Sequence, residues 1–219
     1  EMQRSLVGSE MCIRDRADIP HIKQLMADGS YTLEKRTVLP SSSAVNWASM
    51  FMGAGPELHG YTQWGSKTPE LPSRVLNQHG IFPTIFQLLR DARPEAEIGC
   101  LYEWDGIKYL VDTLALSHYA QAPDYNKHPE ALCGMAEKYI KEKQPTLLAI
   151  CFDNPDHVGH QAGHNTPEYY AKLKELDGYV SRIIQAVTEA GMLKETIFIV
   201  TADLSLIHIS EPTRLRCIS

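Results

Sequence analysis

Apolar residues along this chain fall into short uninterrupted runs that alternate with longer segments of helical spacing. A short apolar run bounded by turn residues is typical of a buried strand, whereas apolar residues three and four positions apart mark one face of a helix. The predicted strands cover residues 97–102, 146–152 and 196–201, and the main helices cover residues 81–91, 128–143 and 166–190. Strands and helices in alternation predict a parallel βαβ sheet.

Weaker patterns outline the remaining elements. We expect a helix over residues 18–28 and a strand over residues 31–39, which Pro40 ends. Residues 44–52 are compatible with a helix, with Ser43 near its N-cap.

Two further segments have mixed patterns. Residues 61–77 contain several Gly, Pro and Ser residues and are predicted to be irregular, and residues 107–127 combine a helical turn with a possible strand at 113–116. In the 81–91 helix, the residues expected to face inward are Ile81, Ile85, Leu88 and Leu89.

Composition narrows the class of protein. The chain has 219 residues, of which 43% are hydrophobic and 22% are charged, and this suits one globular α/β domain. A formal net charge of -6 argues against a nucleic-acid duplex as the main partner. No apolar run reaches membrane-spanning length, and the N-terminus lacks the pattern of a secretory signal. The five cysteines form no CxxC pair, and Cys100 and Cys151 are expected to be core residues of strands.

The two ends of the chain differ in character from the middle. Residues 1–16 and 204–219 resemble translated sequencing-adapter DNA, and neither segment shows sustained periodicity or a helix cap. We therefore expect residues 17–203 to be the authentic part, cut at both ends, and we leave the two flanking segments out of the functional argument.

The segment after the 146–152 strand carries the clearest candidate chemistry. Asp156 and His160 are four residues apart, so a single helical turn would bring a carboxylate and an imidazole to one metal ion. Ligands in open α/β sheets bind beyond the carboxyl ends of strands, which is where these residues fall. A solvated polar loop is the alternative, because a metal site needs more than two ligands.

Two other polar residues occupy comparable positions. Ser43 lies at a predicted helix N-terminus, which favours negative charge and therefore suits an alkoxide nucleophile or a bound phosphate. Asp203 follows the predicted 196–201 strand. Carboxylate, imidazole and alkoxide ligands together suit Zn²⁺, or Mn²⁺ less strongly. Taken singly, Ser43 could be a simple N-cap and Asp203 a turn residue.

Three motifs place these residues in a family pattern. The stretch Pro40-x-x-Ser43-x-x-Asn46, with Gly53-x-x-Pro56-Glu-x-His59-Gly60 after it, resembles the nucleophile segment of the alkaline phosphatase superfamily. The closest branch is the type I phosphodiesterase/nucleotide pyrophosphatase family. Pro155-Asp156-x-x-Gly159-His160 is similar to its first-metal motif, and Val200-Thr-Ala-Asp203 matches the start of its Asp-His-Gly motif.

The resemblance implies a fold and a set of roles. It implies a three-layer α/β/α domain with a mostly parallel central sheet, incomplete at both ends. Ser43 would be the nucleophile and a ligand of the second metal, Asp156 and His160 would bind the first metal, and Asp203 would bind the second. Asn46 and Gln63 are candidate substrate contacts, although Asn46 and His59 could equally be structural.

The implied activity is hydrolysis of phosphate esters with two divalent metal ions, Zn²⁺ or alternatively Mn²⁺. The expected substrates are small phosphodiesters or nucleotide pyrophosphates, and the resemblance suggests an exported or periplasmic protein. A phosphomonoesterase and a non-catalytic binding domain of the same fold are the alternatives. A sulfatase is disfavoured because Ser43-Ala-Val-Asn-Trp lacks the Cys/Ser-x-Pro-x-Arg context.

The sequence departs from the family pattern at both metal sites. The residue after Asp203 is Leu204 where the family has His, and the further ligands expected near the chain ends are missing. Each site keeps two expected ligands, so we expect weak metal binding and little or no activity for this polypeptide.

Overall fold

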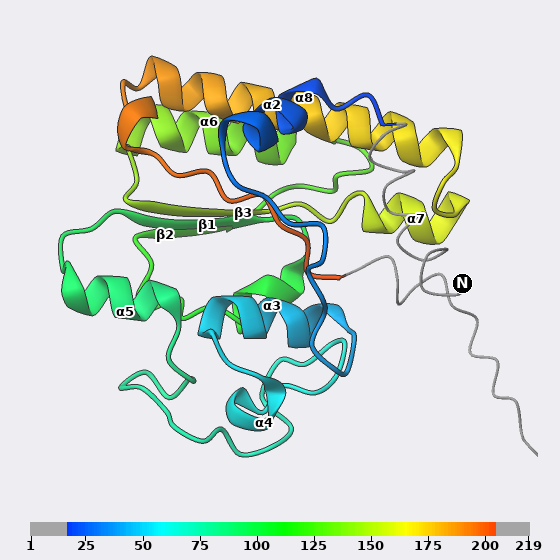
Figure 1. Cartoon of the computed structure of the whole chain (residues 1–219). Helices are drawn as coiled ribbons and strands as arrows, with labels where there is room; N and C mark the ends of the chain where they lie inside the picture. The colour runs from blue at the N-terminus through cyan, green and yellow to red at the C-terminus, as the bar shows by residue number, and fades with distance from the viewer. Residues whose placement is uncertain (1–16, 205–219) are drawn as a thin grey trace, which may run out of the picture.

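The computed structural model describes residues 17–204, so the segment 1–16 and all but the first residue of the segment 204–219 lie outside it. A parallel sheet forms the centre, with strand order β2-β1-β3. The strands are β1 (Ile98–Tyr102), β2 (His118–Gln121) and β3 (Leu147–Cys151). Figure 1 shows α2, α6 and α8 on one face of the sheet and α3 and α5 on the other, which confirms the α/β/α layering.

The helices divide into long covering helices and short connecting ones. Their bounds are α2 Pro20–Asp28, α3 Ser43–Met52, α4 Pro56–His59, α5 Ile85–Ala92, α6 Ala131–Lys143, α7 Asp156–Ala162 and α8 Pro167–Glu189, with 3₁₀ turns η1 Asp105–Tyr109 and η2 Leu193–Glu195. None of the helices between residues 17 and 204 combines the length and apolar character that crossing a bilayer requires.

The central strand β1 explains why the sheet holds together. All five of its residues are buried, and it pairs in parallel with both neighbours, with Tyr102 opposite Gln121 on one side and Cys151 on the other. Such a strand is apolar throughout because helices cover both of its faces. Cys100 and Cys151 are buried free thiols, as expected for small core residues. The parallel strands bring their carboxyl ends to one edge, and the candidate site lies at that edge.

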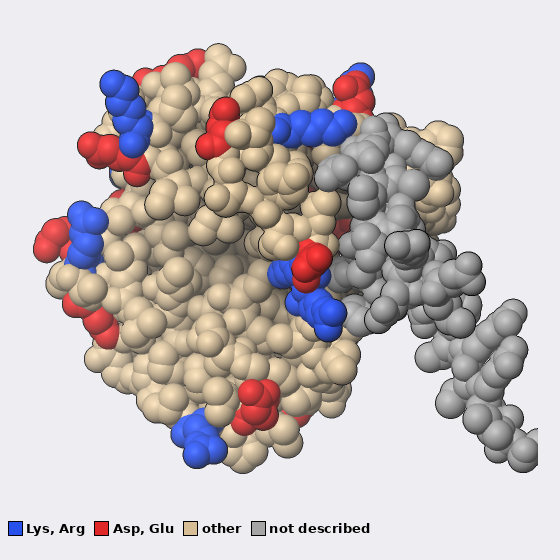
Figure 2. Space-filling view, in the orientation of Figure 1, with Lys and Arg blue, Asp and Glu red and all other residues tan. Residues whose placement is uncertain are grey.

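Two predicted strands are absent, and these predictions were wrong. Residues 31–39 and 196–201 are extended but form no ladder in the described part of the chain. Apolar composition alone does not make a strand, because its backbone groups need an adjacent strand edge. The second segment therefore leaves Ile197 87% and Ile199 82% exposed, while Phe198 packs beside Ile140 and Val187. This segment crosses the face seen in Figures 1 and 2, where charged side chains lie mainly around the rim and the centre is uncharged.

Two other expectations are corrected by local geometry. Helix α5 begins at Ile85 rather than Ile81, because Pro83 disfavours helix before it and Thr84 caps it by accepting from the Gln87 amide at 3.2 Å. Its orientation also differs, since Phe86 is buried whereas Ile85 and Leu88 are exposed. The strand expected at 113–116 lies instead at His118–Gln121, beyond a turn closed by Asp112.

A buried carboxylate joins the first helix to the longest one. Asp177 of α8 is 2% exposed and accepts hydrogen bonds from the backbone amides of His21 (3.2 Å) and Ile22 (2.8 Å). It also lies 2.8 Å from the His21 ring nitrogen. Asp177 thus caps the N-terminus of α2, although it lies more than 150 positions further along the chain. No local sequence pattern reveals this role.

Candidate active site

Ser43 is the first residue of α3, one position after the N-cap Ser42. The preceding segment is fixed by Asn46, whose side-chain oxygen accepts from the Val38 amide at 2.8 Å while its nitrogen donates to the Ser42 carbonyl at 3.0 Å. At the far end, Gly53 ends the helix in the left-handed conformation at φ 61°. Asn46 is buried and its amide is engaged within the fold, which favours the structural alternative for this residue.

His59 also has a structural setting. Its ring is fully buried, Nδ1 accepts from the Tyr61 amide at 3.1 Å, and Nε2 lies 3.0 Å from the Ser49 hydroxyl on α3. Burial lowers the pKa of His59, so the neutral ring is favoured. His59 therefore fixes the short helix α4 against the nucleophile helix.

The Asp156 and His160 pair has the geometry that the spacing predicted. Both residues lie on the seven-residue helix α7 directly beyond β3, and His160 Nε2 is 3.4 Å from Asp156 Oδ2. The His160 side chain is 66% exposed and the Asp156 side chain is 39% exposed, so a ligand from solvent can reach both. His164 packs against Gly159 of this helix and against Tyr169 of α8.

Asp203 brings the two halves of the site together. Burial raises the pKa of Asp203, a hydrogen bond from the Ser43 side chain opposes this shift, and the negative charge of Asp156 adds to it. The Ser43 side chain and the Asp156 charge therefore both lie near Asp203, which is 160 positions from Ser43 along the chain. The structure thus assembles the serine, both aspartates and, through Asp156, His160 at the carboxyl edge of the sheet.

Lys35 lies close to Asp203, although no sequence motif marked it as a candidate site residue. Its ammonium group donates to the Ala202 carbonyl, next to Asp203, and lies 3.8 Å from Met50 Sδ on α3. Burial lowers the pKa of Lys35, and the Asp203 charge opposes this shift. The contact joins the 31–39 segment to Ala202, directly after the 196–201 segment; the sequence pattern assigned both segments to strands.

The donor atoms suit a divalent metal in kind but fall short in number. Carboxylate, imidazole and hydroxyl groups are ligands of Zn²⁺ and Mn²⁺. A catalytic zinc ion has three protein ligands, whereas residues 17–204 contain no cluster of three or more His, Cys, Asp or Glu side chains that could hold a metal. Asp156 with His160, and Ser43 with Asp203, each supply two donors.

Gln63, the other candidate substrate contact, and the neighbouring Trp64 lie on the loop after α4. Gln63 is exposed, and its backbone is closed into a turn by Ser66 at 2.9 and 3.1 Å. Trp64 is 65% exposed and stacks on Trp104, with ring centroids 6.0 Å apart. Trp104 follows β1, so this loop is held beside the carboxyl edge of the sheet.

A second group of titratable residues at this edge was missed by the sequence reasoning. Glu103 follows β1, is 6% exposed, and accepts from the Asp153 amide at 2.7 Å. Burial raises the pKa of Glu103 to about 7; the Asp153 amide opposes this shift and the Asp153 carboxylate adds to it. Nearby, the Tyr125 hydroxyl lies 3.0 Å from His157 Nδ1. Only the strand ends, set side by side by the sheet, bring these residues together.

The raised pKa of Glu103 predicts a pH-dependent stability. Between the ordinary glutamate pKa and about 7, the folded state holds a proton that the unfolded state has lost, so stability falls as pH rises through this window. Glu103→Gln should remove a penalty of up to about 3 kcal/mol above pH 7. Urea unfolding at pH 5 and pH 8 measures this. The exposed Glu142→Gln is the control, and an unchanged pH dependence in Glu103→Gln would contradict the assignment.

Comparison with known proteins gives a family match. The sequence model of the type I phosphodiesterase / nucleotide pyrophosphatase family matches residues 10–218. GPI ethanolamine phosphate transferase 2 of Aspergillus oryzae is 40% identical over 48 residues, which are 22% of this chain and 6% of that protein.

Solved structures share the fold at low identity. An inactive variant of murine ectonucleotide pyrophosphatase/phosphodiesterase 5, in complex with AMP, is 17% identical with a TM-score of 0.60 over 81% of this chain and 49% of that one. Phosphonoacetate hydrolase of Sinorhizobium meliloti is 19% identical with a TM-score of 0.57 over 77% and 48% of the two chains. The chain thus spans about half the length of these proteins. Because the family match covers most of its residues, the chain belongs to the type I phosphodiesterase / nucleotide pyrophosphatase family.

Proposed function

We propose that this chain carries the centre of a hydrolase of small phosphate esters, with phosphodiesters or nucleotide pyrophosphates as substrates. The observation that carries the proposal is the proximity of the Ser43 side chain to Asp203 at the N-terminus of α3. A hydroxyl at a helix N-terminus lies where developing negative charge is stabilised. The AMP complex of a structural neighbour and the family match support the substrate class.

Ser43 and Asp203 are the residues of this chain that act in the first chemical step. Ser43 Oγ forms a bond to phosphorus while the bond from phosphorus to the leaving oxygen breaks. The Asp203 carboxylate, which lies near the Ser43 side chain, would take the hydroxyl proton. The amides of the first turn of α3 would bind the phosphoryl oxygens, because a helix leaves its first amides without intrahelical partners. Water then hydrolyses the phosphoserine.

We infer that divalent metal ions, Zn²⁺ or Mn²⁺, are the cofactors. Asp156 and His160 would hold one ion, and Ser43 and Asp203 would hold the other. Such ions would neutralise phosphate charge and lower the pKa of the serine hydroxyl and of bound water. Two donors on each side predict weak binding of either ion.

Hydrolysis of paired model substrates tests this function. We expect slow turnover of bis(4-nitrophenyl) phosphate at millimolar Zn²⁺ or Mn²⁺, slower turnover of 4-nitrophenyl phosphate, and none after EDTA treatment. Calorimetric titration should show metal dissociation constants at least about 10²-fold weaker than those of sites with complete ligand sets. Metal-independent hydrolysis, or turnover typical of an enzyme with complete metal sites, would contradict the proposal.

A non-catalytic binding domain is the second candidate. The observation that favours it is the pair of two-donor sites, because weakly held metals support phosphate binding more readily than turnover. Binding of AMP without formation of a covalent adduct on Ser43 would identify this alternative.

A further inference from the structure

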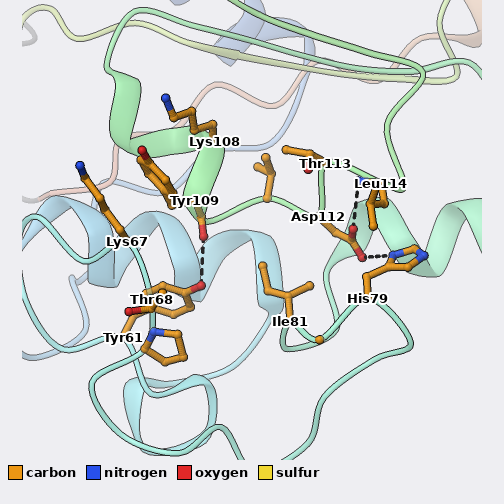
Figure 3. A pocket seen from close by; sticks show the side chains of 13 residues that line it. Tyr61, Lys67, Thr68, His79, Ile81, Lys108, Tyr109, Asp112, Thr113 and Leu114 are labelled. Atoms are coloured by element: carbon orange, nitrogen blue, oxygen red, sulfur yellow. Dashed lines mark hydrogen bonds and ion pairs between the residues drawn. The ribbon is translucent and has the colours of Figure 1, made fainter.

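A separate pocket lies between the loop after α4 and the turn η1. Its volume is about 270 Å³, and its walls include Tyr61, Ile81, Val111 and Leu114. Figure 3 shows that the lining side chains come from residues 61–69, 79–81 and 108–114. Ser43, Asp156, His160 and Asp203 are not among the lining residues, so this cavity is distinct from the candidate active site.

At one end of the pocket, the carboxylate of Asp112 already has hydrogen-bond partners. Asp112 is 3% exposed, and its carboxylate accepts from Asn77 Nδ2 at 2.6 Å and from the Leu114 amide at 3.2 Å. The ring of His79 lies 2.7 Å from the same carboxylate. Asp112 thus closes this end of the cavity with its hydrogen-bonding capacity already used, and it offers no free charge to a ligand.

The opposite end carries two cations beside one aromatic ring. The Nζ atoms of Lys67 and Lys108 lie 5.4 and 5.0 Å from the centroid of the Tyr109 ring. Figure 3 shows the two lysine side chains on either side of Tyr109, with the phenol oxygen directed toward the region between them. Two ammonium groups therefore lie beside one aromatic ring at this end of the pocket.

The existing contacts of Lys67 and Lys108 leave this end of the pocket open to an anion. Lys108 is 2.6 Å from Asp105, but both side chains are more than a third exposed, at 36% and 46%, so this pair contributes little stability. None of the ion pairs among residues 17–204 involves Lys67. An anion between the two ammonium groups would relieve their mutual repulsion and form charge-assisted hydrogen bonds.

We propose that this pocket binds a small organic phosphate monoester, with its phosphate between Lys67, Lys108 and the Tyr109 hydroxyl and its organic group against Tyr61, Ile81 and Val111. The dianionic charge of the phosphate matches two ammonium groups, and it competes with the single charge of Asp105. The cavity volume limits the organic group to about one ring. The proposal does not depend on the function assigned to Ser43.

NMR titration of the Ser43→Ala variant in EDTA with phenyl phosphate is the test, because substrate turnover and metal effects are then absent. We expect a dissociation constant of about 1 mM or tighter, with amide shifts at Tyr61, Lys67 and Tyr109. Inorganic phosphate and benzoate should each bind more weakly, and phenol should not bind. Equal binding of inorganic phosphate would overturn the role of the cavity, and equal binding of benzoate would overturn the phosphate assignment.

Lysine variants locate the anion. Lys67→Met and Lys108→Met, each on the Ser43→Ala background, should weaken phenyl phosphate at least about tenfold. Lys127→Met is the matched control, since Lys127 also pairs three residues back, with Asp124 at 3.8 Å, and does not line the pocket. Shifts confined to residues around positions 43 and 156, or equal affinities in all three variants, would overturn the proposal.

Discussion

Replacing Ser43 with alanine is expected to lower the slow phosphodiester hydrolysis of this chain to the background rate. The Ser43 hydroxyl lies at the N-terminus of α3 near the Asp203 carboxylate, so the variant loses the nucleophile while the proposed proton acceptor remains. Helix α3 itself should be unaffected, because alanine has the higher helix propensity.

The residue before it provides a matched control. Ser42 is the N-cap of α3, and its buried hydroxyl has no hydrogen-bond partner among residues 17–204. Ser42→Ala should therefore keep hydrolysis within a few-fold of the original chain. Acid-quenched samples analysed by mass spectrometry should show a phosphoryl adduct on Ser43 in the original chain and in Ser42→Ala only. An adduct elsewhere, or undiminished hydrolysis by Ser43→Ala, would remove Ser43 from this role.

The second large effect concerns stability. Asp177→Ala should lower the free energy of unfolding by about 3 kcal/mol, because one buried carboxylate accepts from the His21 and Ile22 amides and contacts the His21 ring. The variant leaves the first turn of α2 without its cap and creates a cavity against α8. Asp177→Asn, which keeps one accepting oxygen, should lose less.

Urea denaturation measures this difference. Asp124→Ala is the control, since Asp124 is 48% exposed and its loss should cost less than about 1 kcal/mol. Hydrogen exchange should also become faster in α2 than in α6 for Asp177→Ala. A loss below about 1 kcal/mol in that variant would show that α2 docks on α8 through its apolar face instead.

Much of the local structure was predictable because its causes are local. The strands around 98–102 and 147–151, the Thr166 cap of α8 and the helical turn carrying Asp156 and His160 all follow from short-range patterns. In α8 the Thr166 hydroxyl accepts from the Tyr169 amide at 3.3 Å, as expected of an N-cap followed by proline.

The same sequence patterns gave wrong predictions where residues distant in the sequence decide the structure. The apolar segment at 196–201 has the composition of a strand, but no strand lies beside it in the described part of the chain. Ile85 and Leu88 have helical spacing, yet α5 packs on Phe86 because Pro83 moved its start and so its orientation. Hydrophobicity alone specifies neither a strand's partner nor which face of a short helix is buried.

The sequence by itself determined the types of side chain available for chemistry and the strand ends that carry them, because those depend on residue type and on spacing within a few positions. Only the tertiary structure decided that Ser43 lies near Asp203, that Glu103 is buried beside Asp153, and that Lys67 and Lys108 lie beside one ring. Each of these contacts joins segments brought together by the sheet and its covering helices. Their electrostatic consequences come from burial, which no local pattern specifies.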